Sequence, residues 1–156
     1  MCPLLRGVMP KPKFKKDHVV TSVVAVIINF AGEVLLTQRN IPPFLGQWVM
    51  PGGKIDLGEP IIRAVQREVR EEVGLEVEVQ NLLDVFERVT PGEGHYHFVI
   101  LYYRCLPLSD ELNHNDAEVA EARWVPPDEL WQYRMPEGTK FILEKLFPDP
   151  HYCEIE

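Results

Sequence analysis

The segment from Gly53 to Leu75, with the sequence GKIDLGEPIIRAVQREVREEVGL, constrains the fold of this chain more than any other stretch. It begins with glycine turns and predicts a helix from about Pro60 to Val73. Proline suits the first turn of a helix, where its missing N–H costs little, and Gly74 suits the left-handed position just past the end. The sequence therefore marks both ends of this helix.

The acidic residues of this helix occupy an unusual place. Apolar side chains recur at helical spacing and predict a face packed against a core. They are Ile61, Ile62, Val65, Val69 and Val73. Glu72 falls within that arc, and Glu68 and Glu71 lie on its shoulder. The negative pole of the helix dipole disfavours acidic residues here, and glutamates four residues apart repel each other, so a positive partner is expected.

Two kinds of positive partner fit these carboxylates. Arg67 and Arg70 are within reach, so an ion-pair cluster is one interpretation. The glycine loop favours the other, because glycines let the backbone fold tightly and point its carbonyl oxygens at a ligand. Mg²⁺ prefers oxygen ligands, often one or two carboxylates together with substrate phosphates. A glycine loop beside clustered carboxylates thus predicts a divalent-metal site.

The same residues resemble the Nudix box, Gly-x5-Glu-x7-Arg-Glu-U-x-Glu-Glu-x-Gly-U, in which U is aliphatic. Every fixed position is matched, by Gly53, Glu59, Arg67, Glu68, Val69, Glu71, Glu72, Gly74 and Leu75. The flanking segments WVMPGG (48–53) and ARWV (122–125) also look like this family. The resemblance implies a Nudix hydrolase, which cleaves a nucleoside diphosphate linked to another group X. It also implies an α/β/α sandwich with a mixed β-sheet packed between helices.

For the metal, the resemblance implies Mg²⁺ or Mn²⁺ held by Glu68, Glu72 and the Gly52 carbonyl, with Glu71 sharing the metal or orienting it. One of these carboxylates, or Glu118, removes the proton from the attacking water. Charge grows on the phosphoryl oxygens in such a reaction, so a cation stabilises it.

Further residues support this set. Glu59 and Arg67 form a supporting shell in which Arg67 orients the glutamates, and Gly53 is expected at the substrate. Arg39 ends a predicted strand just before the loop 40–48. In related enzymes an arginine at this place contacts the substrate, and a guanidinium suits phosphate oxygens. An exposed arginine with a surface partner is the alternative for Arg39.

Relatives commonly supply one more acidic residue from a loop late in the chain. Within residues 116–121, Glu118 is the first candidate and Glu121 the second, although acidic loops are usually only solvated. Trp48, in contrast, is expected to pack in the core rather than stack on a base.

The expected substrate is ADP-ribose or a similar nucleotide sugar. The segments PPFLGQWVMPGG (42–53) and HYHFVIL (95–101) resemble the ADP-ribose branch of the family. His95 and His97 lie on one face of that strand, but a metal role is disfavoured because the box already offers oxygen ligands. The alternatives are a (d)NTP pyrophosphohydrolase and, from another class, a non-catalytic nucleotide-sensing module. An RNA-processing role is disfavoured by the acidic balance and the lack of an aromatic, basic stripe.

The remaining segments predict a layered α/β fold. Strands are expected at 18–30 and 33–39, joined as a hairpin, and at 76–89, 95–106 and 122–125, with helices at 126–130 and 136–147. Phe141, Ile142 and Leu146 are expected to pack the last helix on the sheet. Residues 1–16 are expected to form an arm, 17–148 a single domain and 149–156 a tail.

Composition narrows the class further. A net charge of −8 argues against a broad surface for a nucleic-acid polymer, but not against a phosphate ligand bound through a cation. The three cysteines, Cys2, Cys105 and Cys153, suggest neither a disulfide framework nor a zinc site, and Cys105 is expected to be a buried thiol. No apolar run approaches the roughly 20 residues that span a bilayer, so a cytoplasmic address without a membrane partner is expected. Homodimers are common among the enzymes that this chain resembles.

Overall fold

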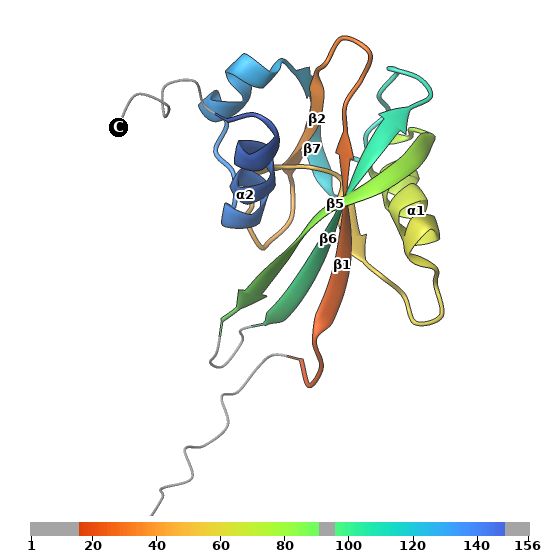
Figure 1. Ribbon diagram of the computed structural model, residues 1–156, viewed down its shortest axis with the longest axis vertical. Coiled ribbons are helices and arrows are strands. Elements are labelled where there is room, and N and C mark those ends of the chain that lie inside the picture. The colour runs from red at the N-terminus through yellow and green to blue at the C-terminus, as the bar shows by residue number, and fades with distance from the viewer. Residues whose placement is uncertain (1–15, 91–95, 149–156) are drawn as a thin grey trace, which may run out of the picture.

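The computed structural model describes residues 16–90 and 96–148. The expected tail at 149–156, the turn between Thr90 and the next strand, His95, Cys2, Cys153 and all but the last residue of the expected arm lie outside this part. The two α-helices lie on opposite sides of the strands (Figure 1), which confirms the α/β/α fold.

The described residues form seven strands, two α-helices and one 3-10 helix. The strands are β1 (Val20–Ile27), β2 (Val34–Arg39), β3 (Trp48–Val49), β4 (Gly52–Lys54), β5 (Val77–Val89), β6 (His97–Pro107) and β7 (Val119–Val125). The helices are α1 (Ile61–Val73), η1 (Pro127–Gln132) and α2 (Glu137–Leu146). The strands divide between a four-stranded mixed sheet, ordered β4-β1-β6-β5, and a three-stranded antiparallel sheet, ordered β3-β2-β7.

The expected hairpin between β1 and β2 is wrong. The chain does reverse at residues 29–32, where Gly32 has a φ of 80° and the Asn29 side chain accepts a hydrogen bond from the Glu33 N–H at 2.9 Å. Beyond the turn itself, however, the described residues of the two segments are linked as strands by no more than an isolated bridge between Ile28 and Val34. β1 pairs with β4 on one edge and with β6 on the other. It therefore has no free edge at which β2 could pair. Turn residues thus determined the reversal of the chain but not the pairing of the strands.

Helix α1 lies where the sequence predicted it, but the face that it buries differs from the predicted one. It begins at Ile61, after Pro60, and ends at Gly74, which has a φ of 70° and donates its N–H to the Arg70 carbonyl. The buried residues are Ala64, Val65, Glu68, Val69, Glu72 and Val73. Ile61 and Ile62 are exposed, contrary to expectation. The helix is therefore turned so that two carboxylates, rather than these two isoleucines, lie on the face toward the sheet.

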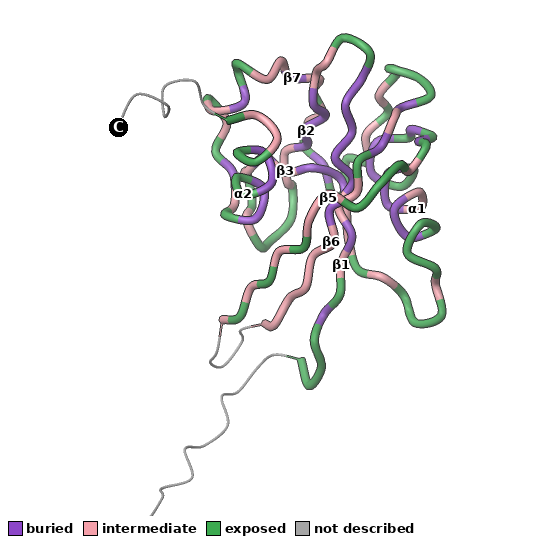
Figure 2. Tube along the Cα trace, viewed as in Figure 1, coloured by how far each residue is buried: buried purple, intermediate pink, exposed green. Residues whose placement is uncertain are grey.

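The core has two parts, one on each side of the four-stranded sheet (Figure 2). Val65, Val69 and Val73 of α1 pack on one side with residues of β1 and β6. Ile142 and Leu143 of α2 pack on the other. The four-stranded sheet therefore lies between the core that packs on α1 and the core that packs on α2.

Several single-residue expectations can be settled in this core. Trp48 is buried and makes an edge-on contact with Tyr133, with ring centroids 5.0 Å apart, so its packing role is confirmed. Cys105 is a buried thiol, and burial raises its pKa to about 12. Phe141 is less buried than expected, although its ring lies 5.2 Å from that of Phe86. No helix in the described ranges is both long and apolar enough to cross a membrane.

Candidate active site

A cavity of about 350 Å³ lies beside the carboxyl-terminal half of α1, where β4 and the end of β2 meet the residues just before β7. The charged residues that line it are Arg39, Lys54, Asp56, Arg67, Glu68, Glu71, Glu72 and Glu118. The structure therefore brings together all four residues expected to be catalytic, although they come from two distant parts of the sequence.

Glu72 is buried, as is Glu68, and 9% of each residue is exposed. Its Oε2 accepts a hydrogen bond from the backbone N–H of Gly52 at 2.9 Å. Burial, followed by the charge of Glu68, raises the pKa of Glu72 to about 8. Glu72 has no ion-pair partner within residues 16–90 and 96–148, and the charge of Arg39, which lowers its pKa, does not outweigh burial. A cation in the cavity would therefore stabilise its ionised form.

Glu68 lies against the glycine loop. A Cβ added to Gly53 would stand 2.5 Å from the Glu68 carboxyl carbon, which is closer than real contacts allow. Burial raises the pKa of Glu68, while its hydrogen bond with Arg67 acts in the opposite direction. Gly53 is thus required for the close approach of β4 and α1 at the site, and the expected contact with substrate remains a prediction.

Arg67 links the carboxylates to one another. Its Nε and Nη2 donate to the two oxygens of Glu59 at 2.7 and 2.9 Å, and its Nη1 donates to Glu68 at 2.9 Å and Glu71 at 3.2 Å. Nη2 also donates to the Lys54 carbonyl at 3.1 Å. The hydrogen bonds from Arg67 lower the pKa of Glu59 to about 2. The geometry fits the supporting roles predicted for Glu59 and Arg67.

Arg70 does not join this network. Its guanidinium forms two hydrogen bonds to Glu76, at 2.6 and 2.9 Å. The ion-pair interpretation is therefore right for Arg67 and wrong for Arg70, because Arg70 lies on the exposed side of α1. Arg67 is shared among Glu59, Glu68 and Glu71, whereas Glu72 forms no ion pair with it and is influenced instead by the charge of Arg39.

The donor atoms at this site are those that a hard divalent cation prefers. Glu68, Glu71, Glu72 and Glu118 all offer oxygen, and two of these carboxylates are buried. Among the described residues, no three His, Cys, Asp or Glu side chains already lie in a metal-binding arrangement. Gly52 contacts Glu72 through its N–H, whereas the prediction assigned its carbonyl to the metal. The residues fit Mg²⁺ or Mn²⁺, and the ligand set itself remains a prediction.

Arg39 stands at the edge of the cavity, as expected for a substrate-binding residue. Burial lowers its pKa, and the charges of Glu72 and Glu118 act in the opposite direction. Its Nε donates to the Pro43 carbonyl at 2.6 Å, so its described partner is the neighbouring loop rather than a surface acid. This contact holds the guanidinium close to the carboxylates.

The two acidic candidates near β7 separate clearly. Glu118 lines the cavity and influences the pKa values of Glu68 and Glu72. Glu121 does not line it and pairs with Arg123 at 2.5 Å. The structure thus favours Glu118 over Glu121, in the order that the sequence predicted.

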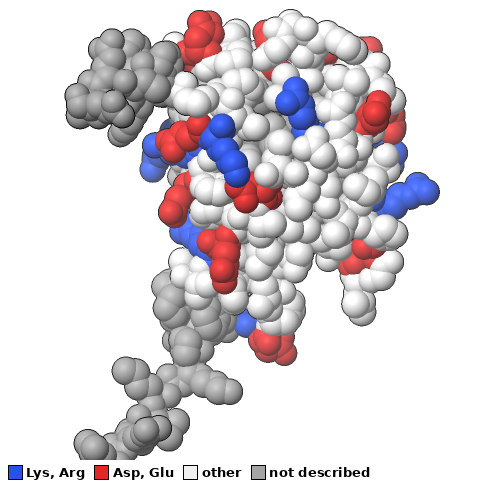
Figure 3. All heavy atoms as spheres, viewed as in Figure 1, with Lys and Arg blue, Asp and Glu red and all other residues white. Residues whose placement is uncertain are grey.

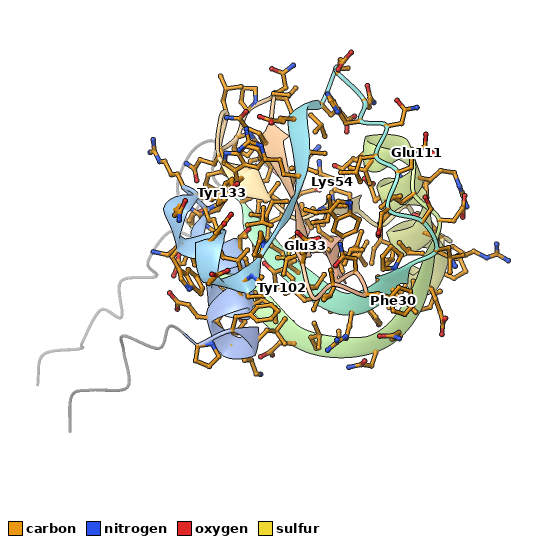
Figure 4. The ribbon with its side chains drawn as sticks, turned by 90° about the horizontal axis from the view of Figure 1, so that it is seen from above. Phe30, Glu33, Lys54, Tyr102, Glu111 and Tyr133 are labelled. Carbon is orange, nitrogen blue, oxygen red and sulfur yellow. The ribbon has the colours of Figure 1, made fainter. Side chains whose placement is uncertain are left out.

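A second cavity of about 290 Å³ adjoins the first and shares Arg39, Val49, Gly52, Gly53 and Lys54 with it. Its aromatic residues are Phe44, Phe86, Phe98 and Tyr102. Tyr102 lies beside α2 (Figure 4), close to Gly138, where an added Cβ would stand 2.8 Å from the tyrosine oxygen. An aromatic cavity open to a cluster of carboxylates can receive a planar group joined to a charged one.

Sequence reasoning missed this second cavity and the role of Lys54 in lining both. Lys54 lies at a variable position of the Nudix box, and only its place directly after Gly53 hinted at the site. The aromatic residues come from the loop before β3, from β5 and from β6. No local spacing relates them, so only the folded chain reveals the group.

His97, the described member of the histidine pair, pairs with Glu87 at 2.8 Å and lines neither cavity. His97 therefore lies apart from the carboxylates, and its lack of a metal role remains a prediction. His95 lies outside the described residues.

Comparison with known proteins identifies the family. The NUDIX domain model matches residues 18–148. The 8-oxo-dGDP phosphatase NUDT18 of Homo sapiens is 36% identical over 124 residues, which are 80% of this chain and 38% of that protein. The chain therefore spans well under half the length of this relative. The nucleoside triphosphatase NudI of Salmonella agona is 30% identical over 132 residues, which are 78% of this chain and 93% of that protein.

The solved structures agree with the sequences. A MutT NUDIX hydrolase from Burkholderia pseudomallei superposes with a TM-score of 0.75 and 31% identity, covering 83% of this chain and 99% of that one. The matched region includes the complete box, both helices and both sheets. The chain belongs to the Nudix hydrolase family.

Proposed function

We propose that this chain hydrolyses a phosphoric anhydride bond in a nucleotide, with Mg²⁺ or Mn²⁺ required, and that nucleoside di- or triphosphates are its first candidate substrates. The continuity of the two cavities carries this proposal. One is lined by carboxylates and cations and the other by aromatic rings, and they share Arg39, Gly52, Gly53 and Lys54. A molecule with a phosphate chain and a nucleobase matches this division.

The protein's own residues suit each part of the reaction. A bound divalent cation supplies positive charge to the phosphoryl oxygens and lowers the pKa of a water. Arg39 and Lys54 border the cavity and offer donors to the phosphate chain. Arg67 holds Glu68 and Glu71 in place, which prearranges the carboxylates for the charge that they must balance. Glu118, which makes no hydrogen bond through its side chain among the described residues, is available to accept the proton of the attacking water.

The names of the relatives favour nucleoside di- and triphosphates as substrates. The human relative is named for 8-oxo-dGDP and the bacterial one for nucleoside triphosphates. The two segments that favoured ADP-ribose supply Pro43, Phe44, Phe98 and Ile100 to the aromatic cavity. These residues can receive a base from any of the candidates, so they do not identify the group X.

ADP-ribose is the second candidate, because a third hollow adjoins the carboxylates. This hollow, of about 710 Å³, shares Lys54 and Asp56 with the carboxylate cavity and is also lined by His18, Thr21 and Leu57. A nucleotide sugar needs room for a group on each side of its diphosphate, and this hollow offers the second space. A module that only senses nucleotides is the least favoured alternative, since every carboxylate of the box is present.

On the face shown in Figure 3, lysine and arginine side chains are scattered among acidic ones. That face therefore offers no continuous basic surface of the kind that a nucleic-acid polymer needs.

Product analysis tests the proposal. Purified protein would be incubated with Mg²⁺ and, separately, with 8-oxo-dGDP, a deoxynucleoside triphosphate or ADP-ribose. A triphosphate should give a monophosphate and pyrophosphate, a diphosphate should give a monophosphate and phosphate, and ADP-ribose should give AMP and ribose 5-phosphate. Binding without turnover of any of the three, with Mg²⁺ or Mn²⁺, would support the sensing module instead.

A further inference from the structure

Asn115 connects the backbones of two carboxylate residues at the site. Its N–H donates to the Glu72 carbonyl at 2.9 Å, and its carbonyl accepts the N–H groups of Glu118 at 3.1 Å and Val119 at 2.9 Å. Its side-chain Oδ1 accepts the N–H of Ala117 at 3.1 Å. The turn that carries Glu118 is thus attached directly to the carboxyl-terminal end of α1.

Asn40 holds the same turn from the opposite side. Its N–H donates to the Glu118 carbonyl at 2.9 Å, and its side-chain Nδ2 donates to the Asp116 carbonyl at 2.8 Å. Asn40 directly follows Arg39, which lines both cavities. The backbone positions of Arg39, Glu72 and Glu118 are therefore related through two asparagines.

Glu118 needs such support, because it lies near charges of its own sign, just before the point where Val119 of β7 pairs with Arg39 of β2. Its residue is exposed, and its carboxylate makes no hydrogen bond or ion pair within the described ranges. Glu68 and Glu72 both repel it, as its influence on their pKa values shows. A freely moving turn would carry Glu118 away from the cavity, and the six hydrogen bonds made by Asn40 and Asn115 oppose that movement.

We propose that Asn40 and Asn115 are positioning residues that hold Glu118 at the carboxylate cavity. The proposal rests on the proposed function, since it assigns Glu118 a part in metal binding or proton removal. Neither asparagine lines the cavity, so each acts through the turn rather than by touching substrate.

Matched asparagine variants separate the hydrogen bonds from added charge. Asn40→Asp loses the Nδ2 donor, whereas Asn115→Asp keeps the Oδ1 acceptor, and each adds one negative charge beside the same turn. Asn115→Ala removes the acceptor. Asn81→Asp on β5 is the distant control, because Asn81 is exposed and its side chain makes no hydrogen bond among the described residues. Each variant would be made in the wild-type and the Glu118→Gln background.

Three properties would be measured, namely kcat/KM, the affinity for Mn²⁺ by electron paramagnetic resonance and the melting temperature. We expect Asn40→Asp and Asn115→Ala to lower kcat/KM or Mn²⁺ affinity about three- to tenfold, as for the loss of one hydrogen bond. Asn115→Asp should retain most of both properties, and Asn81→Asp should match the wild type. In the Glu118→Gln background, Asn40→Asp and Asn115→Ala should change kcat/KM and Mn²⁺ affinity less than about twofold, because the effects of coupled residues are not additive.

Equal losses in both backgrounds, or no loss in either, would overturn the proposal, since the asparagines would then not act through Glu118. A wild-type protein that hydrolyses none of the nucleotides would refute the proposed function without removing this test. In that case the Mn²⁺ affinities alone test the positioning role. A smaller effect of the asparagine substitutions in the Glu118→Gln background would support it, and an equal effect in both backgrounds would overturn it.

Discussion

The backbone N–H of Gly52 donates a hydrogen bond to the Glu72 carboxylate, 2.9 Å away and 20 residues later in the sequence. This contact ties β4 to the carboxyl-terminal half of α1 across the site. It satisfies one lone pair of a buried carboxylate but supplies no full positive charge, so the electrostatic cost of Glu72 is only partly offset. We interpret this imbalance as the feature that a divalent cation corrects.

Glu72→Gln should abolish most turnover without unfolding the domain. The amide keeps the size of the side chain but removes the charge that the cation requires, so kcat should fall at least about 100-fold. The melting temperature near pH 7 should stay equal or rise, because the amide does not ionise and so removes the cost of burying an acidic group. Activity assays and thermal denaturation of the purified variant check both expectations, and turnover near the wild-type level would remove Glu72 from the mechanism.

The metal-free protein should lose stability as the pH rises from about 4.5 to about 8. The pKa of Glu72 is raised from 4.5 to about 8 in the folded state, so the folded state binds more protons than the unfolded state across this interval. Between these two pKa values the carboxyl of Glu72 ionises more readily in the unfolded state, so raising the pH favours unfolding. Urea denaturation in EDTA at several pH values should show this fall in the wild type and a flatter profile in Glu72→Gln; identical profiles would refute the assignment.

The Glu59–Arg67 pair should act in the opposite sense at low pH. Arg67 lowers the pKa of Glu59 from 4.5 to about 2, so its stabilising effect is complete above about 4.5 and is lost as the pH falls toward 2. Glu59→Gln should lower stability at pH 7 and weaken the acid dependence in this range. Acid titrations followed by circular dichroism compare the two proteins. An unchanged acid transition in the variant would show that the pair does not contribute.

Gly53→Ala should disturb the site more than the fold. The new Cβ would meet the Glu68 carboxylate at 2.5 to 2.6 Å, so the side chain must move away from its place beside Arg67. We expect about a tenfold or greater loss of kcat/KM, of the size seen when a catalytic group is misplaced by about 1 Å. Steady-state kinetics and a melting curve test this expectation. A variant with a much lower melting temperature, whose folded fraction has wild-type kcat/KM, would contradict it.

Phe44→Ala should weaken recognition of the nucleobase alone. Stacking of a base on an aromatic ring contributes about 1–3 kcal/mol, so KM for a nucleotide should rise roughly five- to 100-fold. Arg88 lies 5.3 Å from the centroid of the Phe44 ring and supports it from β5. Affinity for inorganic tripolyphosphate, which has no base, should not change. Phe30→Ala is the control, because Phe30 is 88% exposed in the turn after β1; equal effects of both substitutions would refute the stacking role.

The sequence predicted those parts of the site that depend on local spacing. The ends of α1, the glycine loop and the clustering of Glu68, Glu71 and Glu72 all lie within one segment, and the structure places them as expected. Glu118, the first of the two acidic candidates, also lines the cavity, but it was named from family resemblance rather than from spacing, and its role remains a prediction.

Features that depend on pairing between distant segments were harder to predict. β3 and β4 have only two and three residues, too few for a strand pattern to show. The hairpin between β1 and β2 was wrong because both edges of β1 are taken by strands distant in sequence. The aromatic cavity was missed for the same reason, since Phe44, Phe86 and Phe98 meet only after the sheet has formed.

Anomalous diffraction from crystals grown with Mn²⁺ and a non-hydrolysable nucleotide tests the central claim most directly. We predict a manganese peak in the carboxylate cavity, within coordination distance of Glu68 and Glu72 and of a nucleotide phosphate oxygen, with the base between the rings of the adjoining cavity. A cavity without manganese, in which Glu68 still pairs with Arg67 while the nucleotide binds elsewhere, would contradict the account.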